Sequence, residues 1–234
     1  MRRRPRLITV LILIAVIGFA PGAIVRWAIE QAVAGKVSGM LGTARSYSVD
    51  VSGGLFDIVR GRVNQVSIRG NDVKLSNGVV VDRLDVDLCG VRFKPNQTIT
   101  GVQSTAFTAL LSEGNMNDYL RASRSDLSDA KVSLADGKLS LTARPRVMAI
   151  RTPVRVEGTM CIVEGTKLNL VLNRLSARGI RVPGMIRGRI QHDLNPVLDT
   201  QQMGMGAKLT RVAIANGEIT LCGTADVERA LAAK

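Results

Sequence analysis

The apolar positions of the chain follow three patterns in turn: a continuous run, a helical repeat and a long stretch of alternation. Residues 7–25 carry no charge, and at about 1.5 Å of helical rise per residue they can cross the hydrocarbon core of a bilayer. Residues 26–42 repeat an apolar side chain every three or four positions, which predicts an amphipathic helix ending at Gly42. From Tyr47 onward the period is two, which predicts antiparallel strands with one apolar and one polar face.

Three hairpins are predicted by turn residues whose flanking apolar faces agree. Two-residue type I′ turns are expected at Asp136-Gly137 and Asn216-Gly217, and a three-residue turn at Glu164-Gly165-Thr166. Turn type and face pattern are independent signals, and together they fix the register. The predicted cross-strand pairs are Val132 with Leu141, Leu134 with Leu139, Gly158 with Leu172, Met160 with Leu170, Ile162 with Leu168, Val212 with Leu221, and Ile214 with Ile219.

A bulge is predicted at Cys89-Gly90, because the apolar alternation that includes Leu88 resumes out of phase at Val91. Long strands with such bulges favour one long, strongly curved sheet. Two helices are expected to interrupt it. Ser112 caps the first, which carries on one side Met116, Tyr119 and Leu120. Pro183 begins the second, which ends at Asn195-Pro196 and carries on its apolar face Met185, Ile186, Ile190 and Leu194.

Four arginines precede the apolar run, so the N-terminus should stay in the cytoplasm and the rest of the chain should lie outside it. A cleaved signal peptide has the same order of regions and is the competing interpretation, although Pro21 follows the best cleavage site, Gly18-Phe19-Ala20. Either reading predicts an envelope protein; an uncleaved anchor would make it a single-pass membrane protein with an extracytoplasmic body. The predicted segments are a transmembrane anchor or signal (1–25), the amphipathic helix (26–42), one α+β domain (43–226) and a C-terminal tail (227–234).

The charge of the chain points to a membrane. The net charge is +13, and the first 26 residues hold five arginines and no acids, which leaves +8 (13 − 5) for the body. A basic body beside a membrane is attracted to anionic headgroups. Nucleic acid is not an expected partner, because the predicted topology puts it out of reach and few aromatic residues could stack on bases.

The sequence offers little catalytic chemistry. His192 is the only histidine, and a triad with its neighbour Asp193 is disfavoured because adjacent helical residues point apart. Metal-ligand spacings and phosphate-binding glycine loops are absent. The odd number of cysteines leaves open one disulfide plus a free thiol, or three apolar core residues: Cys89, Cys161 and Cys222. No enzymatic activity, metal or cofactor is therefore expected.

Two groups of residues are candidates for lipid contact. Arginines match phosphate oxygens, so a run without acids could bind a headgroup or could simply be a solvated basic face: Arg174, Arg178, Arg181, Arg187 and Arg189. The apolar strand face suits acyl chains, although a dry core uses the same residue types. The candidate tunnel-lining residues are Leu84, Val86, Leu88, Val132, Leu134, Leu139, Leu141, Met160, Ile162, Leu168, Leu170, Ile214 and Ile219.

Several segments in order resemble the LmeA family of phospholipid-binding proteins over roughly residues 26–226. After the helix comes a strand region that reads YSVDVSGGLFDIVRGRVNQVSIRGNDVKLSNGVVVDRLDVDLCGVRF, followed by SEGNMNDYL, LNPVLD and LTRVAIANGEITLCGTAD. The short helix carries the family's Asn-x-x-Leu, Leu-Asn-Pro follows the last helix, and the final hairpin ends in glycine. The unusually basic, aromatic-poor body departs from the family, so no headgroup preference carries over.

The resemblance implies an envelope protein that binds phospholipid and has a tubular lipid-binding-like fold: a long curved antiparallel sheet wrapped around a helix. The leading hypothesis is thus a membrane-anchored, extracytoplasmic protein whose partners are the membrane and anionic phospholipid, and whose only cofactor-like ligand is that lipid. It could carry or present lipid for envelope assembly. The alternatives are a structural adaptor with a solid core, and an enzyme acting on lipid-linked glycans through two carboxylates about 5–10 Å apart.

Overall fold

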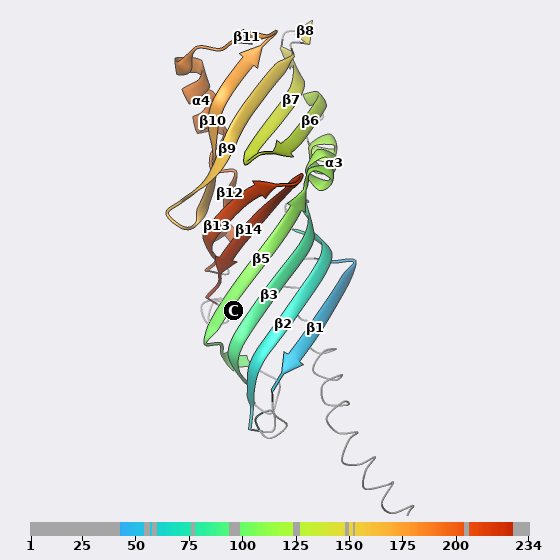
Figure 1. Ribbon diagram of the computed structural model, residues 1–234, viewed down its shortest axis with the longest axis vertical. Coiled ribbons are helices and arrows are strands. Elements are labelled where there is room, and N and C mark those ends of the chain that lie inside the picture. The colour runs from blue at the N-terminus through green and yellow to red at the C-terminus, as the bar shows by residue number, and fades with distance from the viewer. Residues whose placement is uncertain are drawn as a thin grey trace, which may run out of the picture.

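The computed structural model describes residues 43–53, 57, 60–75, 78–93, 99–123, 127–147, 150–151, 153–203 and 206–226 (Figure 1). The predicted anchor, amphipathic helix and C-terminal tail lie outside these residues. Within the described part of the chain, no helix has the length and apolar character needed to span a bilayer.

Two antiparallel sheets follow one another along the long axis of an elongated molecule (Figure 1). The first sheet has the order β1-β2-β3-β5-β14-β13, with β4 beside β3. Its strands are β1 (Ser46–Ser52), β2 (Arg62–Lys74), β3 (Val80–Phe93), β4 (Ile99–Gly101), β5 (Ser104–Ser112), β13 (Lys208–Ala215) and β14 (Glu218–Thr224).

The second sheet has the order β11-β10-β9-β7-β6, with β12 beside β10 and β8 beside β7. Its strands are β6 (Leu127–Ala135), β7 (Lys138–Val147), β8 (Ile150–Arg151), β9 (Val154–Val163), β10 (Lys167–Ala177), β11 (Ile180–Arg181) and β12 (Leu198–Asp199). The helices are α3 (Glu113–Ser123), α4 (Gly184–Leu194) and a 3₁₀ turn, η1 (Thr200–Met203).

The α+β class and the antiparallel strands are as predicted, but the single long sheet is wrong. The chain leaves the first sheet after β5, passes through α3 and builds the second sheet. It then returns with β13 and β14, and β14 pairs with β5, matching Glu218 with Ser112 and Thr224 with Ala106. Both sheets are open. Helices α3 and α4 are attached to the edges of the second sheet, so neither is the helix that the curved sheet was expected to wrap around.

The three predicted hairpins are confirmed residue by residue. Leu134 pairs with Leu139 and Val132 with Leu141, across a turn in which Asp136 and Gly137 have φ of 50° and 74°. The other two hairpins likewise show all the predicted pairs, including Met160 with Leu170 and Ile214 with Ile219. These registers were predictable because each depends on fewer than twenty consecutive residues.

The irregularity at Gly90 takes a different form from the predicted bulge. Leu88 and Val91 are both buried, as expected, and Gly90 has φ of 63°. The register between β2 and β3 is nevertheless unshifted, because β2 has the same three-residue spacing between buried residues: Val63 and Val66 are also both buried. The two strands therefore bend together, rather than one strand gaining a residue over the other.

The helix boundaries are confirmed. Ser112 precedes α3, and its hydroxyl accepts a hydrogen bond from the Asn115 N–H at 3.3 Å. Asp82 on β3 holds this cap in place, because its carboxylate accepts bonds from the Ser112 N–H at 2.6 Å and hydroxyl at 2.8 Å. Helix α4 follows Pro183 and ends at Leu194.

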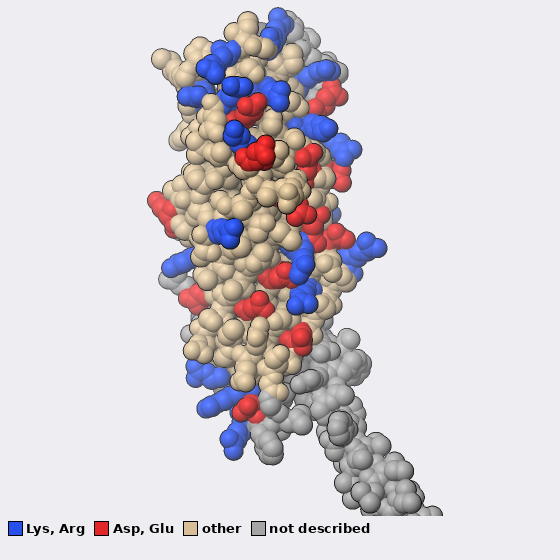
Figure 2. All heavy atoms as spheres, viewed as in Figure 1, with Lys and Arg blue, Asp and Glu red and all other residues tan. Residues whose placement is uncertain are grey.

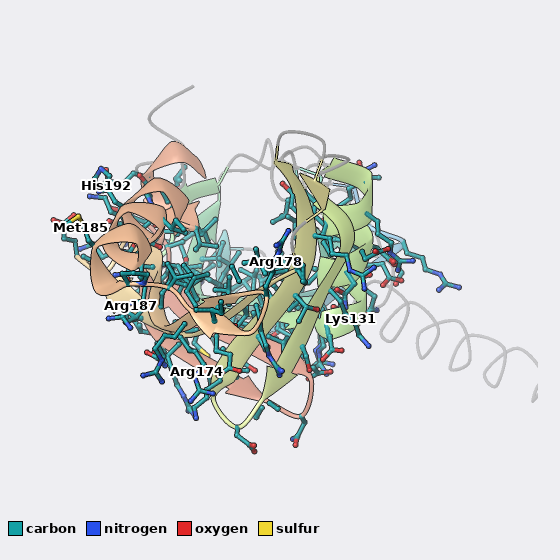
Figure 3. The ribbon with its side chains drawn as sticks, turned by 90° about the horizontal axis from the view of Figure 1, so that it is seen from above. Lys131, Arg174, Arg178, Met185, Arg187 and His192 are labelled. Carbon is teal, nitrogen blue, oxygen red and sulfur yellow. The ribbon has the colours of Figure 1, made fainter. Side chains whose placement is uncertain are left out.

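Met185 was expected on the buried face of α4, and that prediction is wrong, because the side chain is 90 % exposed. At about 100° per residue, Met185 lies about 160° around the helix from Arg187. The face of α4 that carries Arg187 and Gln191 is turned toward β10, as is Asn195 just after the helix. Met185 consequently points away from the body (Figure 3).

Candidate functional site

Two apolar clusters account for most of the core. The first-sheet cluster consists of Val51, Val63, Val66, Ile68, Val86, Leu88, Val91 and Val102, with the half-buried Tyr47, Val49, Leu84 and Phe107 around it. The junction cluster lies where the two sheets meet, and side chains from both sheets, α3 and α4 belong to it or pack against it. Its buried members are Val132, Leu134, Leu139, Val156, Leu170, Leu172, Leu175, Ile214 and Ile219.

The predicted tunnel-lining residues are divided between these clusters. Leu84, Val86 and Leu88 belong to the first-sheet cluster. Ile162 and Leu168 face each other beside the Glu164–Thr166 turn and belong to neither. The remaining candidates are in the junction cluster or are half-buried against it: Val132, Leu134, Leu139, Leu141, Met160, Leu170, Ile214 and Ile219. The junction is therefore the part of the described molecule where the most candidates come together.

A half-buried rim surrounds the junction cluster. Its members are Leu111, Met116, Leu120, Leu141, Val154, Met160, Val182, Ile190, Val212 and Leu221. Every member of the cluster and its rim is Val, Leu, Ile or Met, so no side-chain polar group would be stranded against a hydrocarbon ligand. The rim residues are partly exposed, and they are the positions where such a ligand can first make contact.

Two asparagines hold the edges of the second sheet beside this cluster. Asn117 of α3 donates from Nδ2 to the Val132 carbonyl at 3.1 Å and accepts from the Val132 N–H at 2.7 Å. Asn195, after α4, makes the same pair of bonds to Leu170 of β10, at 2.9 and 2.7 Å. We call these two contacts the edge clamps; they satisfy backbone groups that an open sheet edge would otherwise expose.

Successive turns of α4 extend the second clamp along β10. Gln191 accepts from the Leu172 N–H at 3.0 Å, and Arg187 donates to the Asn173 carbonyl at 3.2 Å. The Asn-x-x-Leu and Leu-Asn-Pro motifs seen in the sequence therefore supply the edge clamps. Sequence reasoning noted the motifs but missed this use, since the clamped backbone lies 15 and 25 residues away.

The candidate headgroup arginines do not form one group. Arg174 lies 3.8 Å from Glu157, and Arg187 is engaged with the backbone of β10. Arg178 and Arg181 are exposed and form no salt bridge or side-chain hydrogen bond with any described residue. The side chain of the fifth, Arg189, is not among those described.

Two cavities lie on the second sheet, and none of the tunnel candidates lines either of them. One, of about 370 Å³, lies between α4 and β10 and is lined by Lys167, Asn169, Gly188, Gln191, His192, Asn195 and Pro196. Its lysine bonds to Glu164 at 2.7 Å, and this hydrogen bond raises the pKa of Lys167. The described residues contain no His, Cys, Asp or Glu cluster able to hold a metal, and the three cysteines are free thiols.

The second cavity, of about 310 Å³, lies at the far end of the same sheet and is lined by Asp129, Thr142, Ala143, Arg144, Pro153, Val154, Arg155, Ser176 and Gly179. Its two arginines are already paired, Arg144 with Asp129 at 3.0 Å and Arg155 with Glu157 at 3.2 Å. Figure 2 shows that Lys and Arg side chains gather at this end of the molecule.

A family model described as LmeA-like phospholipid-binding matches residues 21–224 of the chain. None of the curated proteins and none of the solved structures matches it.

Proposed function

Because the chain belongs to the LmeA-like phospholipid-binding family, we propose that it holds the acyl chains of a phospholipid against the junction cluster and its rim. The headgroup would stay at the basic end of the second sheet, where Arg178 and Arg181 are unpaired among the described residues. The proposed activity is binding and presentation of lipid, with no catalytic step and no cofactor besides the lipid.

The observation that carries the proposal is the composition of the junction. A surface made of aliphatic and Met side chains runs from β6 and β7 through α3 to β13 and β14, and ten of its members are only half-buried. Most of the deeper members are less than a tenth exposed, so an acyl chain would enter by separating the side chains that pack on them. Both sheets contribute to the cluster, and the junction is where a small relative shift would open it.

The proposed location is the extracytoplasmic side of a membrane, with residues 1–25 as anchor or signal. The arginines before residues 7–25 and the basic body support this location. There the protein would carry or present lipid for assembly of the cell envelope.

Native mass spectrometry of the full chain, purified from a membrane-containing host, tests the proposal. We expect phospholipid at a fixed stoichiometry with the wild-type protein. The variant Leu141→Asn/Met160→Gln should lose at least about tenfold in occupancy, because each buried polar group without a partner costs about 1–3 kcal/mol. A wild-type protein that stays empty after incubation with phospholipid vesicles would exclude lipid binding.

Val171→Asn is the matched control. Val171 lies on the opposite face of β10, next to the inward Leu170, and is 37 % exposed. Its substitution should leave lipid occupancy unchanged. Equal occupancy in the junction variant and the control would place the lipid elsewhere.

A structural adaptor is the second candidate function, and one observation favours it. Leu134, Leu139 and Ile219 are only 3 %, 5 % and 2 % exposed, as in an ordinary solid core. An adaptor would recruit an envelope partner through its basic end and would contain no lipid. A folded, persistently empty protein in the same mass spectra would support this function.

A further inference from the structure

Two large apolar side chains are presented to solvent at one end of the molecule. Ile180 in β11 is 74 % exposed and Met185 in the first turn of α4 is 90 % exposed. The other large apolar residues exposed among those described, Val171 and Val197, are 37 % and 49 % exposed. Strand β11 forms the upper rim of the second sheet, and α4 begins just beyond it (Figure 1). We call residues 178–185 the tip segment.

The backbone of the tip segment is firmly held. Arg178 and Gly179 have φ of 50° and 79° and form the turn of a hairpin in which Ala177 pairs with Ile180. The Arg178 N–H bonds to the Pro153 carbonyl at 2.9 Å, and the Val182 N–H bonds to the Leu175 carbonyl at 2.9 Å. Ile180 is therefore exposed because the hairpin directs it outward, and ordering it for binding costs little entropy.

Two unpaired arginines lie close to Ile180 in the tip segment. Arg178 and Arg181 flank Ile180, and neither is neutralised by a described residue. The sequence has no acidic residue between Glu164 and Asp193. Seen from above, Arg178 lies near the middle of this end of the molecule, while Met185 lies at its periphery (Figure 3). Exposed aliphatic residues interleaved with unpaired arginines are typical of surfaces that enter the interface of an anionic bilayer.

We propose that the tip segment docks the protein onto an anionic phospholipid bilayer, with Ile180 and Met185 entering the boundary between headgroups and acyl chains. Arg178 and Arg181 contact lipid phosphates, and their aliphatic stems lie along the apolar boundary. The charge complementarity selects a lipid surface, because a protein partner for Ile180 and Met185 would not require two unpaired cations beside Ile180. The inference rests on the proposed function in two ways: docking gives the bound lipid a route to the bilayer, and Arg178 and Arg181 are the arginines proposed above to hold its headgroup.

Vesicle flotation tests the docking directly. The full chain is kept soluble in amphipol, which covers the apolar residues 7–25 in every variant, and is mixed with phosphatidylcholine vesicles containing 30 % phosphatidylglycerol. We expect wild-type protein to float with these vesicles and much less with pure phosphatidylcholine. Ile180→Asp/Met185→Asp should weaken binding by more than about 30-fold, since it removes two apolar anchors and adds two repelled charges.

A second variant removes the charges without adding any. Arg178→Asn/Arg181→Gln should weaken binding to the anionic vesicles about 30-fold, because each basic residue near such a surface contributes about fivefold. Asn-Gly is a favoured type I′ turn, so this variant keeps the hairpin. Its binding to pure phosphatidylcholine should be unchanged.

Matched controls separate the contribution of the tip segment to vesicle binding from that of the overall charge. Lys208→Gln/Arg211→Gln removes the same two charges from exposed positions of β13, near the middle of the molecule, and should change binding less than about threefold. Val197→Asp is the corresponding control for the apolar anchors, because Val197 is an exposed apolar residue that lies beyond the far end of α4.

Tip variants that bind like the wild type, or controls that lose as much as the tip variants, would overturn the docking proposal. Lipid occupancy in native mass spectra is a separate readout, so docking and lipid binding can each fail alone.

Discussion

Replacing Gly223 with alanine is expected to lower the free energy of unfolding by about 3 kcal/mol or more. Gly223 lies in β14 and pairs with Phe107 of β5 on one side and Leu209 of β13 on the other. A Cβ added at Gly223 would overlap the Phe107 ring and the carbonyl oxygen of Lys208. The oxygen belongs to a paired strand and cannot move away without breaking the ladder.

Thermal or urea unfolding of the full chain measures this effect. For a domain of about 200 residues, 1 kcal/mol corresponds to about 2–4 °C, so the melting temperature should fall by about 6–12 °C. Gly188→Ala is the matched control, because nothing lies within 4 Å of the position its Cβ would take, in the middle of α4. That substitution should stabilise the protein by up to about 1 kcal/mol, since glycine is unfavourable inside a helix.

A double variant separates the two contacts at Gly223. Phe107→Leu/Gly223→Ala replaces the flat ring with a smaller, more flexible side chain and should recover part of the stability lost in Gly223→Ala alone. Additive losses would mean that the Phe107 ring is not a source of the strain, and the Lys208 carbonyl would then account for all of it.

Gly223 also illustrates what the sequence could reveal. The glycine that ends the last hairpin was noticed as a family feature, and the register of that hairpin was predicted from Asn216-Gly217. The reason for the glycine lies in β5, more than a hundred residues earlier, because β14 inserts beside that strand. No local sequence feature indicates which distant strands pair. For the same reason, the sequence predicted one long sheet where the fold has two open sheets.

The candidate site shows the same limit. Strand alternation correctly identified the apolar faces, and most of the predicted tunnel-lining positions belong to the junction cluster or its rim. The headgroup arginines were grouped because they follow one another in sequence. The fold separates them: Arg187 is turned toward the edge of β10, while Arg178 is placed in a tight turn at the tip. Charged residues that follow one another through a strand, a turn and a helix do not lie on one face of the molecule.

The edge clamps carry the second large prediction: the double variant Asn117→Ala/Asn195→Ala should lose about 4 kcal/mol. Each asparagine satisfies one N–H and one carbonyl of a strand edge, on Val132 and Leu170. A partly buried backbone group that loses its partner costs about 1–3 kcal/mol, and at the lower end of this range the two groups freed in each single variant cost about 2 kcal/mol together. The clamps act on opposite edges of the second sheet, and the two losses should therefore add.

Aspartate at either position gives a graded test of the same bonds. Asn117→Asp keeps the acceptor for the Val132 N–H but places a second oxygen against the Val132 carbonyl, so its loss should match or exceed that of the alanine variant at neutral pH. At a pH low enough to protonate the carboxyl, the side chain can donate again, and stability relative to wild type should recover.

Asn71→Ala is the control for the clamps, because within the described part of the chain its side chain bonds only to the exposed Ser46 hydroxyl, at 3.2 Å. It should change stability by less than about 0.5 kcal/mol. Urea unfolding of the single, double and control variants supplies all the free energies needed. If the clamp variants unfold like Asn71→Ala, water replaces the asparagines at the strand edges, and α3 and α4 are held by their apolar contacts alone. If they unfold as predicted, the two short motifs fix the helices to the sheet edges on either side of the junction, and the apolar rim keeps its shape because of them.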